Sequence, residues 1–425
     1  MTRRKILYVV LDGLGDRPVA SLGGKTPLEA ADTPFLDELA QKGETGLMDT
    51  IGPGIAPESD AAVMSILGYE VEEYYTGRGP LESFGAGLEV PEGCLAWRCN
   101  FATVDEDWKI VDRRVGRNLA DEEAGELAAA VQEQVELPAA TFDFKHTLGH
   151  RACLVIQSLQ HRLSGDVDNC DPAYARHGVF SVALENPGDR VVEAKPLKDS
   201  VSARIGAELT NDFMRQSYEV LERHPVNQRR RAANKMPGNF ILVRDAGDSL
   251  PRLPSFQQRY GTTFGSLVEM PVEVGIAKLT GMGEVPVMST GADPERGFAD
   301  WADKTLAGLD HFDGLYVHLK GPDVFGHDGD AQGKARNIEL IDSRYFGPIV
   351  KALTLPSFVI AVTADHSTPC EIKAHSADPV PLLISSGGLE PEGALQFGES
   401  ECAKGQLGRR RGPELVPKLI ELANT

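Results

Sequence analysis

The sequence predicts an α/β protein built on a doubly wound sheet, with a smaller inserted α+β domain. Short apolar runs near both ends of the chain each finish at polar residues, as buried strands do at the edge of a sheet. Helical patterns alternate with these runs, whereas the middle of the chain has a different, more polar pattern. At 425 residues, the chain also exceeds what one hydrophobic core usually supports.

The first predicted strand is the run KILYVVL at residues 5–11, which ends at Asp12 and Gly13. Its apolar residues do not alternate with polar ones, a pattern typical of a central strand that is covered on both faces. Because α/β sheets bind ligands at the C-terminal ends of their strands, Asp12 is a candidate functional carboxylate. The aspartate so soon after the basic start, with no small-residue cleavage site, argues against a signal peptide.

The other strands of the core are predicted late in the chain, at residues 314–323, 357–366 and 380–386. Helical periodicity at residues 33–43 and 335–353 predicts helices that alternate with the strands. The sheet therefore combines both ends of the chain.

The inserted domain is predicted at residues 91–236, between core segments at 1–90 and 237–425. It contains the strand patterns LAWRCNFATV and CLVIQSL, the acidic helical pattern DEEAGELAAAVQEQV and the polar run HPVNQRRRAANK. We detect no internal repeat or long low-complexity tract.

Composition excludes several classes of partner. A formal net charge of -20 leaves no basic surface for nucleic acid or an acidic membrane. No apolar run is long enough to cross a bilayer. Six cysteines without CxxC pairs favour a reducing cytoplasm. We expect a cytoplasmic protein with a small-molecule substrate, and its oligomeric state is left open.

Two groups of residues at predicted strand ends are candidate metal ligands. Asp323 and His327 follow a predicted strand and are four residues apart, so a helical turn would aim both at one ion. Asp365 and His366 end the run FVIAVTA, and His375 follows nine residues later. Spacing alone leaves alternatives open, because a DxxxH match arises easily by chance and Asp-His before Ser-Thr-Pro is also typical of a solvated turn.

Taken with Asp12, these residues give three carboxylates and three imidazoles at one predicted sheet edge. That mixture suits zinc or manganese better than magnesium or calcium, and two neighbouring ions could neutralise a phosphoryl group. The other histidines in polar or loop contexts are expected to be surface or structural residues, namely His146, His161 and His311.

Ser59 is a candidate nucleophile. It follows the glycine- and proline-rich loop GPGIAPE and precedes a helical pattern, so it would lie at a helix N-terminus that favours an anion. The alternative is that Ser59 and Asp60 only cap this helix.

The order of these residues resembles the alkaline phosphatase superfamily, and in detail the archaeal-type 2,3-bisphosphoglycerate-independent phosphoglycerate mutases. The resemblance spans nearly the whole chain. It rests on the blocks LDGLGDRP, PESDAAVMSILGYE, YYTGRGPLES, RCNFATVD, HPVN, LPSFQQRYG, VHLKGPDVFGHDGD, TADHSTPC and HSADPVPLLI. One departure is Glu58, because the residue before the serine is usually small in this family.

The resemblance implies an alkaline-phosphatase-like core and the interconversion of 3-phosphoglycerate and 2-phosphoglycerate through a phosphoserine at Ser59. It also implies two divalent ions, manganese first, with zinc, cobalt and magnesium as alternatives. One ion would be held by Asp12, Ser59, Asp365 and His366, and the other by Asp323, His327 and His375.

Retention of glycerate between the two transfers needs cationic side chains, preferably arginines. The candidates are Arg117 and Arg151 from the insertion, Arg244 and Lys278 from the core, and Lys320 beside the metal turn. Each could equally be a surface charge.

Two other functions stay open at this stage. A metal-dependent phosphatase or another phosphomutase of the same superfamily would carry the same ligands, and a protein that only binds metal would not need Ser59. An inserted domain that closed over the site would exclude water, and so would favour a mutase over a phosphatase.

Overall fold

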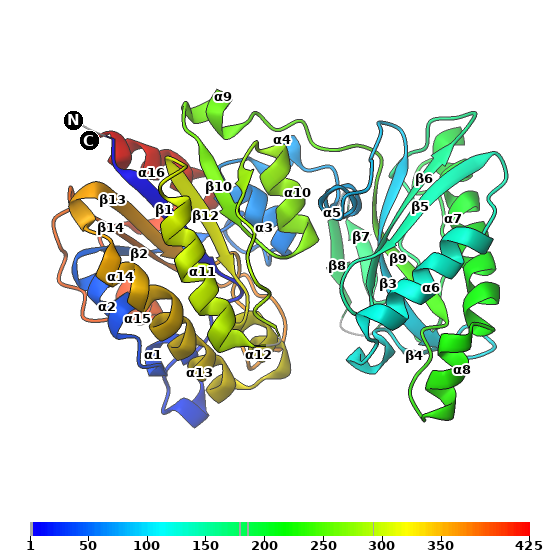
Figure 1. Ribbon diagram of the computed structural model, residues 1–425, viewed down its shortest axis with the longest axis horizontal. Helices are drawn as coiled ribbons and strands as arrows, with labels where there is room; N and C mark the ends of the chain where they lie inside the picture. Colours follow the sequence, from blue (N-terminus) through cyan, green and yellow to red (C-terminus); the bar gives the residue numbers. More distant parts are fainter. Residues whose placement is uncertain (1–2, 178–179, 185–186, 292) are drawn as a thin grey trace. The chain divides into compact units, whose positions relative to one another are not determined.

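The computed structural model describes residues 3–177, 180–184, 187–291 and 293–425, over which the chain forms two compact units (Figure 1). Unit 1 comprises Met1–Tyr74, Leu253–Glu269 and Ile276–Thr425. Unit 2 comprises Tyr75–Arg252 and Met270–Gly275. Unit 2 therefore contains the segment 91–236 and extends beyond it at both ends.

Unit 1 is built on a mixed eight-stranded sheet with the strand order β11-β10-β12-β1-β13-β14-β2-β15. β1 is central and runs parallel to β12 on one side and β13 on the other, whereas β14 is antiparallel to β13 and β2. The strands are β1 Lys5–Leu11, β2 Gly43–Asp49, β10 Phe264–Leu267, β11 Gly283–Glu284, β12 Gly314–Leu319, β13 Phe358–Thr363, β14 Val380–Ser386 and β15 Gly408–Arg411.

Residues Ile6–Leu11 of β1 are buried without alternation, so both faces of the sheet are covered there, as the apolar run predicted. The helices of unit 1 are α1 Pro27–Ala30, α2 Pro34–Gln41, α3 Ser59–Ile66, α4 Val71–Tyr74, α9 Phe256–Tyr260, α11 Pro294–Gly308, α12 Pro322–Asp328, α13 Ala331–Ile341, α14 Gly347–Ala352, α15 Glu399–Cys402 and α16 Leu415–Asn424. The helix α10 Pro271–Leu279 begins in unit 2 and ends in unit 1. A π-helical segment, Asp342–Phe346, joins α13 to α14. The predicted α/β class is confirmed, with a mixed sheet.

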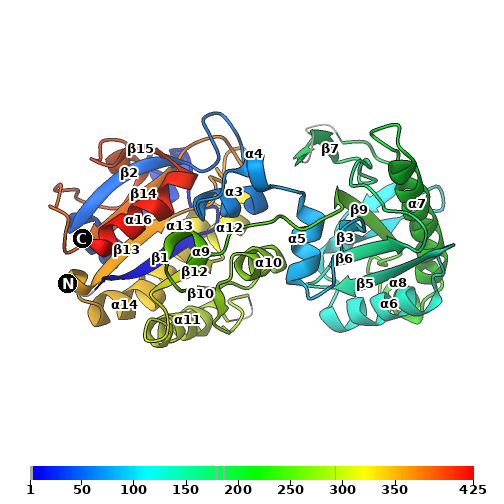
Figure 2. The ribbon, with the colours of Figure 1, turned by 90° about the horizontal axis from the view of Figure 1, so that it is seen from above.

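Unit 2 has a five-stranded antiparallel sheet in which β3 pairs with β4, β6 and β9, and β5 pairs with β6. Figure 2 shows α6 and α7 beside this sheet. The elements of unit 2 are α5 Arg78–Gly85, β3 Leu95–Val104, β4 Ile110–Asp112, α6 Asp121–Gln134, β5 Ala140–His146, β6 Arg151–Ser158, β7 Tyr174–His177, β8 Phe180–Ala183, α7 Val201–Glu222, α8 Pro225–Ala232 and β9 Phe240–Gly247. The inclusion of α5 and β9 explains why this unit exceeds the expected insertion.

Short 3-10 turns complete the two units: η1 Ala20–Leu22, η2 Val115–Arg117, η4 Leu355–Ser357 and η5 Gly412–Glu414. Within the part of the chain that the structure describes, no helix is both long enough and apolar enough to cross a membrane. All six cysteines are free and buried.

Candidate active site

The strand order of unit 1 brings the candidate ligands to one edge of the sheet. β1, β12 and β13 are parallel neighbours, so their C-terminal ends meet, and these ends are followed by Asp12, by α12, and by Asp365 and His366. β14 is antiparallel, so the residues before it, including His375, come to the same edge. β2 runs antiparallel to β14 and is followed by the loop that leads to Ser59.

The first cluster consists of Asp12, Asp365 and His366, whose possible ligand atoms lie within 4.8 Å of one another. Asp365 Oδ1 accepts hydrogen bonds from the backbone N–H groups of Gly13 and His366, both at 3.1 Å. Among the described residues, none donates a hydrogen bond to Asp365 Oδ2, although this atom is buried. Burial and the neighbouring Asp12 raise the pKa of Asp365 well above its usual range. A divalent cation would offset both costs, so these residues fit a metal ion.

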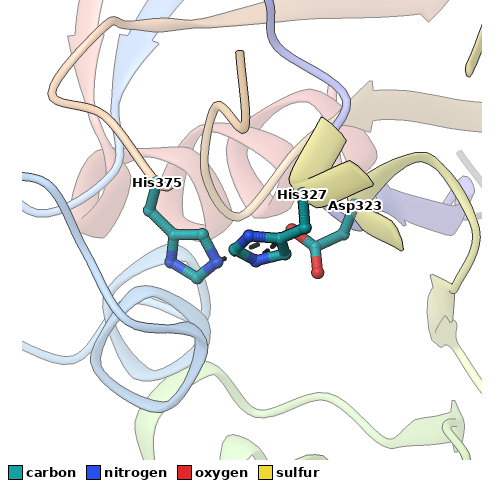
Figure 3. Close-up of side chains that lie close together, drawn as sticks. All are labelled: Asp323, His327 and His375. Carbon is teal, nitrogen blue, oxygen red and sulfur yellow. Dashed lines mark ion pairs between the residues drawn. The ribbon is translucent and has the colours of Figure 1, made fainter. Parts of the chain in front are cut away.

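The second cluster consists of Asp323 and His327 on α12 and His375 before β14, as Figure 3 shows. The Nε2 atoms of His327 and His375 lie 3.5 and 3.6 Å from Asp323 Oδ1. Each imidazole also contacts a backbone carbonyl through Nδ1, that of Lys373 at 3.0 Å and that of Pro57 at 2.9 Å. Because a carbonyl can only accept, each Nδ1 carries the proton, which leaves Nε2 as the ligand atom.

The two clusters are neighbours, and Ser59 lies beside them. The rings of His366 and His375 are stacked with their centroids 3.7 Å apart. Ser59 Oγ lies 3.4 Å from His366 Nε2. Ser59 is the first residue of α3, while Glu58 occupies the N-cap position without a side-chain capping bond to the helix. Ser59 therefore does not occupy the N-cap position that the alternative gave it.

Lys320 contacts the first cluster, with Nζ 3.0 Å from Asp12 Oδ2. Although burial raises the pKa of Asp12, the Lys320 ammonium and nearby histidines lower it well below its usual range. Lys320 Nζ also lies 3.5 Å from Nε2 of His318, a fully buried residue that the sequence did not single out. Lys278, by contrast, is exposed on α10.

Unit 2 contains its own group of charges, here called the arginine cluster: Arg78, Arg98, Arg151 and Arg244, with Glu82. Arg98 on β3 lies directly opposite Arg244 on β9, and Arg151 on β6 lies opposite Asn100, two residues along β3 from Arg98. Because successive side chains of a strand point to opposite faces of the sheet, the three arginines lie on the same face. α5 packs on β3 and supplies Arg78 and Glu82. Glu82 Oε2 lies 3.0 Å from Arg78 Nε and 3.4 Å from Arg98 Nε.

Positive charge exceeds negative charge in the arginine cluster. Burial, Arg244 and Arg78 lower the pKa of Arg98 to about 10. Burial raises the pKa of Glu82, but Arg98 and Arg78 outweigh it and bring the value to about 2. Within the described part of the chain, no group accepts a hydrogen bond from Arg98 Nε, which is buried. An anion with several acceptor oxygens would satisfy such donors.

Some of the predicted cationic residues lie in the arginine cluster, and others lie elsewhere in the fold. Arg151 and Arg244 are together, but Arg244 was expected in the core and instead lies in unit 2, because β9 pairs with β3. Arg117 is exposed at the end of η2. The sequence reading missed Arg78 and Arg98, although both lie in blocks that carried the family resemblance.

Comparison with known proteins agrees with these features. The family model of the 2,3-bisphosphoglycerate-independent phosphoglycerate mutases matches residues 40–227. A relative of that name from Aeropyrum pernix is 43% identical, with 98% of this chain and 99% of the relative covered. A relative of the same name from Thermococcus gammatolerans is 42% identical, with coverage of 100% and 98%.

Solved structures give the same result. A protein from Pyrococcus horikoshii is 33% identical with a TM-score of 0.81, covering 100% of this chain and 98% of that one. A cofactor-independent phosphoglycerate mutase from Thermoplasma acidophilum is 32% identical with a TM-score of 0.65, and the coverage is 99% and 100%.

These matches make the chain an α/β enzyme of the isomerase class. The likeness extends over nearly the full length of the chain and of its relatives. The chain belongs to the family of 2,3-bisphosphoglycerate-independent phosphoglycerate mutases.

Proposed function

We propose that the chain interconverts 3-phosphoglycerate and 2-phosphoglycerate through a phosphoserine on Ser59, in an alkaline-phosphatase-like core. The observation that carries this proposal is the position of Ser59 Oγ, 3.4 Å from His366 Nε2 at the N-terminus of α3. Transfer forms the Ser59 Oγ–P bond and breaks the bond between phosphorus and the 3-oxygen of glycerate, while the serine proton ends on the released hydroxyl. The 2-hydroxyl then takes the phosphoryl group in the reverse sense.

Two metal ions fit the clusters of unit 1. Asp12, Asp365 and His366 would hold one ion with Ser59, and the second cluster would hold the other. Such ions supply positive charge that neutralises phosphoryl oxygens and favours the ionised form of a serine hydroxyl. Manganese is the first choice, with zinc, cobalt and magnesium as alternatives, because the ligands mix imidazole with carboxylate.

The protein groups have separate tasks in this scheme. The N-terminal turn of α3 presents backbone N–H groups and a positive dipole end to the phosphoserine. Arg151 and Arg244, with Arg78 and Arg98, would hold the anionic groups of the substrate, since planar guanidinium groups match carboxylate and phosphate oxygens. Lys320 would add a positive charge beside Asp12. Substrate roles for Arg117 and Lys278, which are exposed, stay predictions, as does a role for unit 2 as a water-excluding cap.

Product analysis tests the proposal. Incubation with 3-phosphoglycerate and manganese should yield 2-phosphoglycerate with little inorganic phosphate, and rapid acid quenching should trap phosphate on Ser59. The Ser59→Ala variant should lose both products while still binding metal through the remaining ligands.

The alternative function is a metal-dependent phosphatase or another phosphomutase of the same superfamily. It would be favoured if the unmodified enzyme released mainly inorganic phosphate, or left 3-phosphoglycerate untouched while it cleaved other phosphate esters. Turnover by Ser59→Ala at the unmodified rate would contradict both functions.

A further inference from the structure

One hydroxyl group joins the two ligand clusters of unit 1. Thr368 Oγ1 lies 2.7 Å from Asp323 Oδ1 and 3.0 Å from His366 Nδ1, and the side chain is fully buried. Asp323 belongs to one cluster and His366 to the other. Neither the ligand sets nor the sequence motifs assigned Thr368 a role.

The directions of these two hydrogen bonds follow from the chemistry of the groups. An ionised carboxylate can only accept, so the single Thr368 proton is donated to Asp323. The hydroxyl oxygen must then accept from His366, which places the imidazole proton on Nδ1. His366 Nε2 is left with its lone pair, and this atom faces Ser59 Oγ and the two carboxylates of its own cluster.

Without this acceptor, the opposite tautomer would be favoured. His366 Nε2 lies 3.3 Å from Asp365 Oδ2 and 3.4 Å from Asp12 Oδ1, and both oxygens attract a proton. A proton on Nε2 would block the lone pair that a metal ion needs. Thr368 therefore opposes a competing arrangement that the neighbouring carboxylates favour.

The position of Thr368 is fixed from several sides. Its backbone N–H donates to the carbonyl of Gly15 at 3.0 Å, and its own carbonyl accepts from Lys334 Nζ at 3.0 Å. The approach of neighbouring segments depends on two glycines. A Cβ on Gly13 would lie 2.8 Å from Thr368 Oγ1, and one on Gly326 would lie 2.3 Å from the Thr368 carbonyl oxygen. Gly326 lies on α12 between the ligands Asp323 and His327.

We propose that Thr368 is a positioning residue shared by both metal sites: it fixes the metal-binding tautomer of His366 and orients Asp323 through the same hydroxyl. This inference rests on the proposed two-metal function. Outer hydrogen-bond partners of metal ligands typically contribute about 10- to 100-fold to metal affinity. Loss of the Thr368 hydroxyl should therefore lower the affinity for both metal ions by a factor in this range.

The test replaces Thr368 by valine, which keeps the shape, and by serine, which keeps the hydroxyl. Calorimetric titration of metal-free protein with Mn²⁺ measures both sites, and ¹⁵N NMR of labelled histidine in metal-free protein reports the His366 tautomer. Thr280→Val is the matched control, because Thr280 is buried and its hydroxyl donates to the carbonyls of Ile276 and Ala277 in α10.

We expect Thr368→Val to weaken the binding of both Mn²⁺ ions and to move the imidazole proton of His366 to Nε2. Thr368→Ser and Thr280→Val should behave like the unmodified protein. Unchanged affinities with the proton still on Nδ1, or weakening at one site alone, would overturn the inference. If Thr368→Val does not fold, an Nε2 proton on His366 in the unmodified metal-free protein would overturn it equally. Fewer than two bound ions in the unmodified protein would instead refute the two-metal function, and the tautomer measurement would still test Thr368.

Discussion

The two units bury charge of opposite sign. In unit 1, carboxylates and imidazoles converge at one edge of a mixed sheet, and Lys320 offsets only part of the negative charge. In unit 2, four arginines gather on one face of an antiparallel sheet around the carboxylate of Glu82, and Asp245 pairs with Arg244. Each unit therefore has an uncompensated excess of charge: the ligand clusters of unit 1 favour a cation, and the arginine cluster of unit 2 favours an anion.

The largest expected effect comes from removing the metal ions that the two ligand clusters of unit 1 are proposed to hold. Chelator treatment should reduce mutase activity to background, and Mn²⁺ should restore it without 2,3-bisphosphoglycerate, since neutralisation of phosphoryl charge depends on the ions. Activity is measured with a coupled assay for 2-phosphoglycerate before and after metal is returned. Full activity in protein shown to be metal-free by elemental analysis would refute the proposal that the ligand clusters of unit 1 need a cation.

A compensated buried pair in unit 1 provides the contrast with both clusters. Lys334 Nζ lies 2.9 Å from Asp16 Oδ2, and both side chains are fully buried. Lys334→Met should destabilise the protein by about 3–5 kcal/mol, because Asp16 would remain buried and charged without its ion-pair partner. The double variant with Asp16→Asn should recover a large part of this loss. Urea unfolding measures both, and equal loss in the single and double variants would show that the charge is not the cause.

The pH dependence of stability tests whether the arginine cluster stabilises the ionised carboxylate of Glu82. Arginine neighbours hold the pKa of this buried carboxyl at about 2, below its ordinary value of 4.5. A depressed pKa stabilises the folded state above pH 4.5, and this contribution is lost as the pH falls toward 2. Glu82→Gln should therefore cost about 3 kcal/mol near pH 7, at 1.4 kcal/mol per pKa unit.

The difference between unmodified protein and Glu82→Gln should shrink progressively below pH 4.5. Urea unfolding at a series of pH values follows it. A difference that stays constant from pH 7 to 3 would mean that the arginines do not stabilise the carboxylate.

The smallest expected effect concerns product partition. Arg151→Ala or Arg244→Ala should lower kcat/KM by about 10- to 100-fold, the value of one or two charge-assisted hydrogen bonds. Free glycerate should then escape more often, so inorganic phosphate should rise relative to 2-phosphoglycerate. Arg204→Ala is the control, because Arg204 is an exposed residue paired with Asp199. A ratio unchanged in the cluster variants would exclude the cluster from glycerate retention.

The sequence could predict the ligand clusters of unit 1 better than the arginine cluster of unit 2, because they are built differently. Asp12, Asp323, Asp365 and His366 each follow a strand whose apolar run is visible in the sequence, so the edge they share could be inferred. The arginine cluster depends on strand pairing. β9 is wholly buried and has the composition of a core strand, so the sequence could not show that Arg244 lies opposite Arg98.

Thr368 was missed for a related reason. It lies within the block TADHSTPC that was recognised, but its function depends on contact with Asp323, which is distant in the chain. Nothing in the spacing of a Ser-Thr-Pro turn distinguishes a threonine that orients ligands from one that only ends a strand.

The order of the strands along the chain also affects how the protein is made. Every strand of the five-stranded sheet lies between Leu95 and Gly247, whereas β1 must wait for β12, which ends at Leu319, and for β13, which ends at Thr363. During synthesis, unit 2 can therefore complete its sheet while the first strand of unit 1 still lacks both neighbours. Until then, the apolar segment KILYVVL lacks both of its native neighbours and is available for wrong pairing.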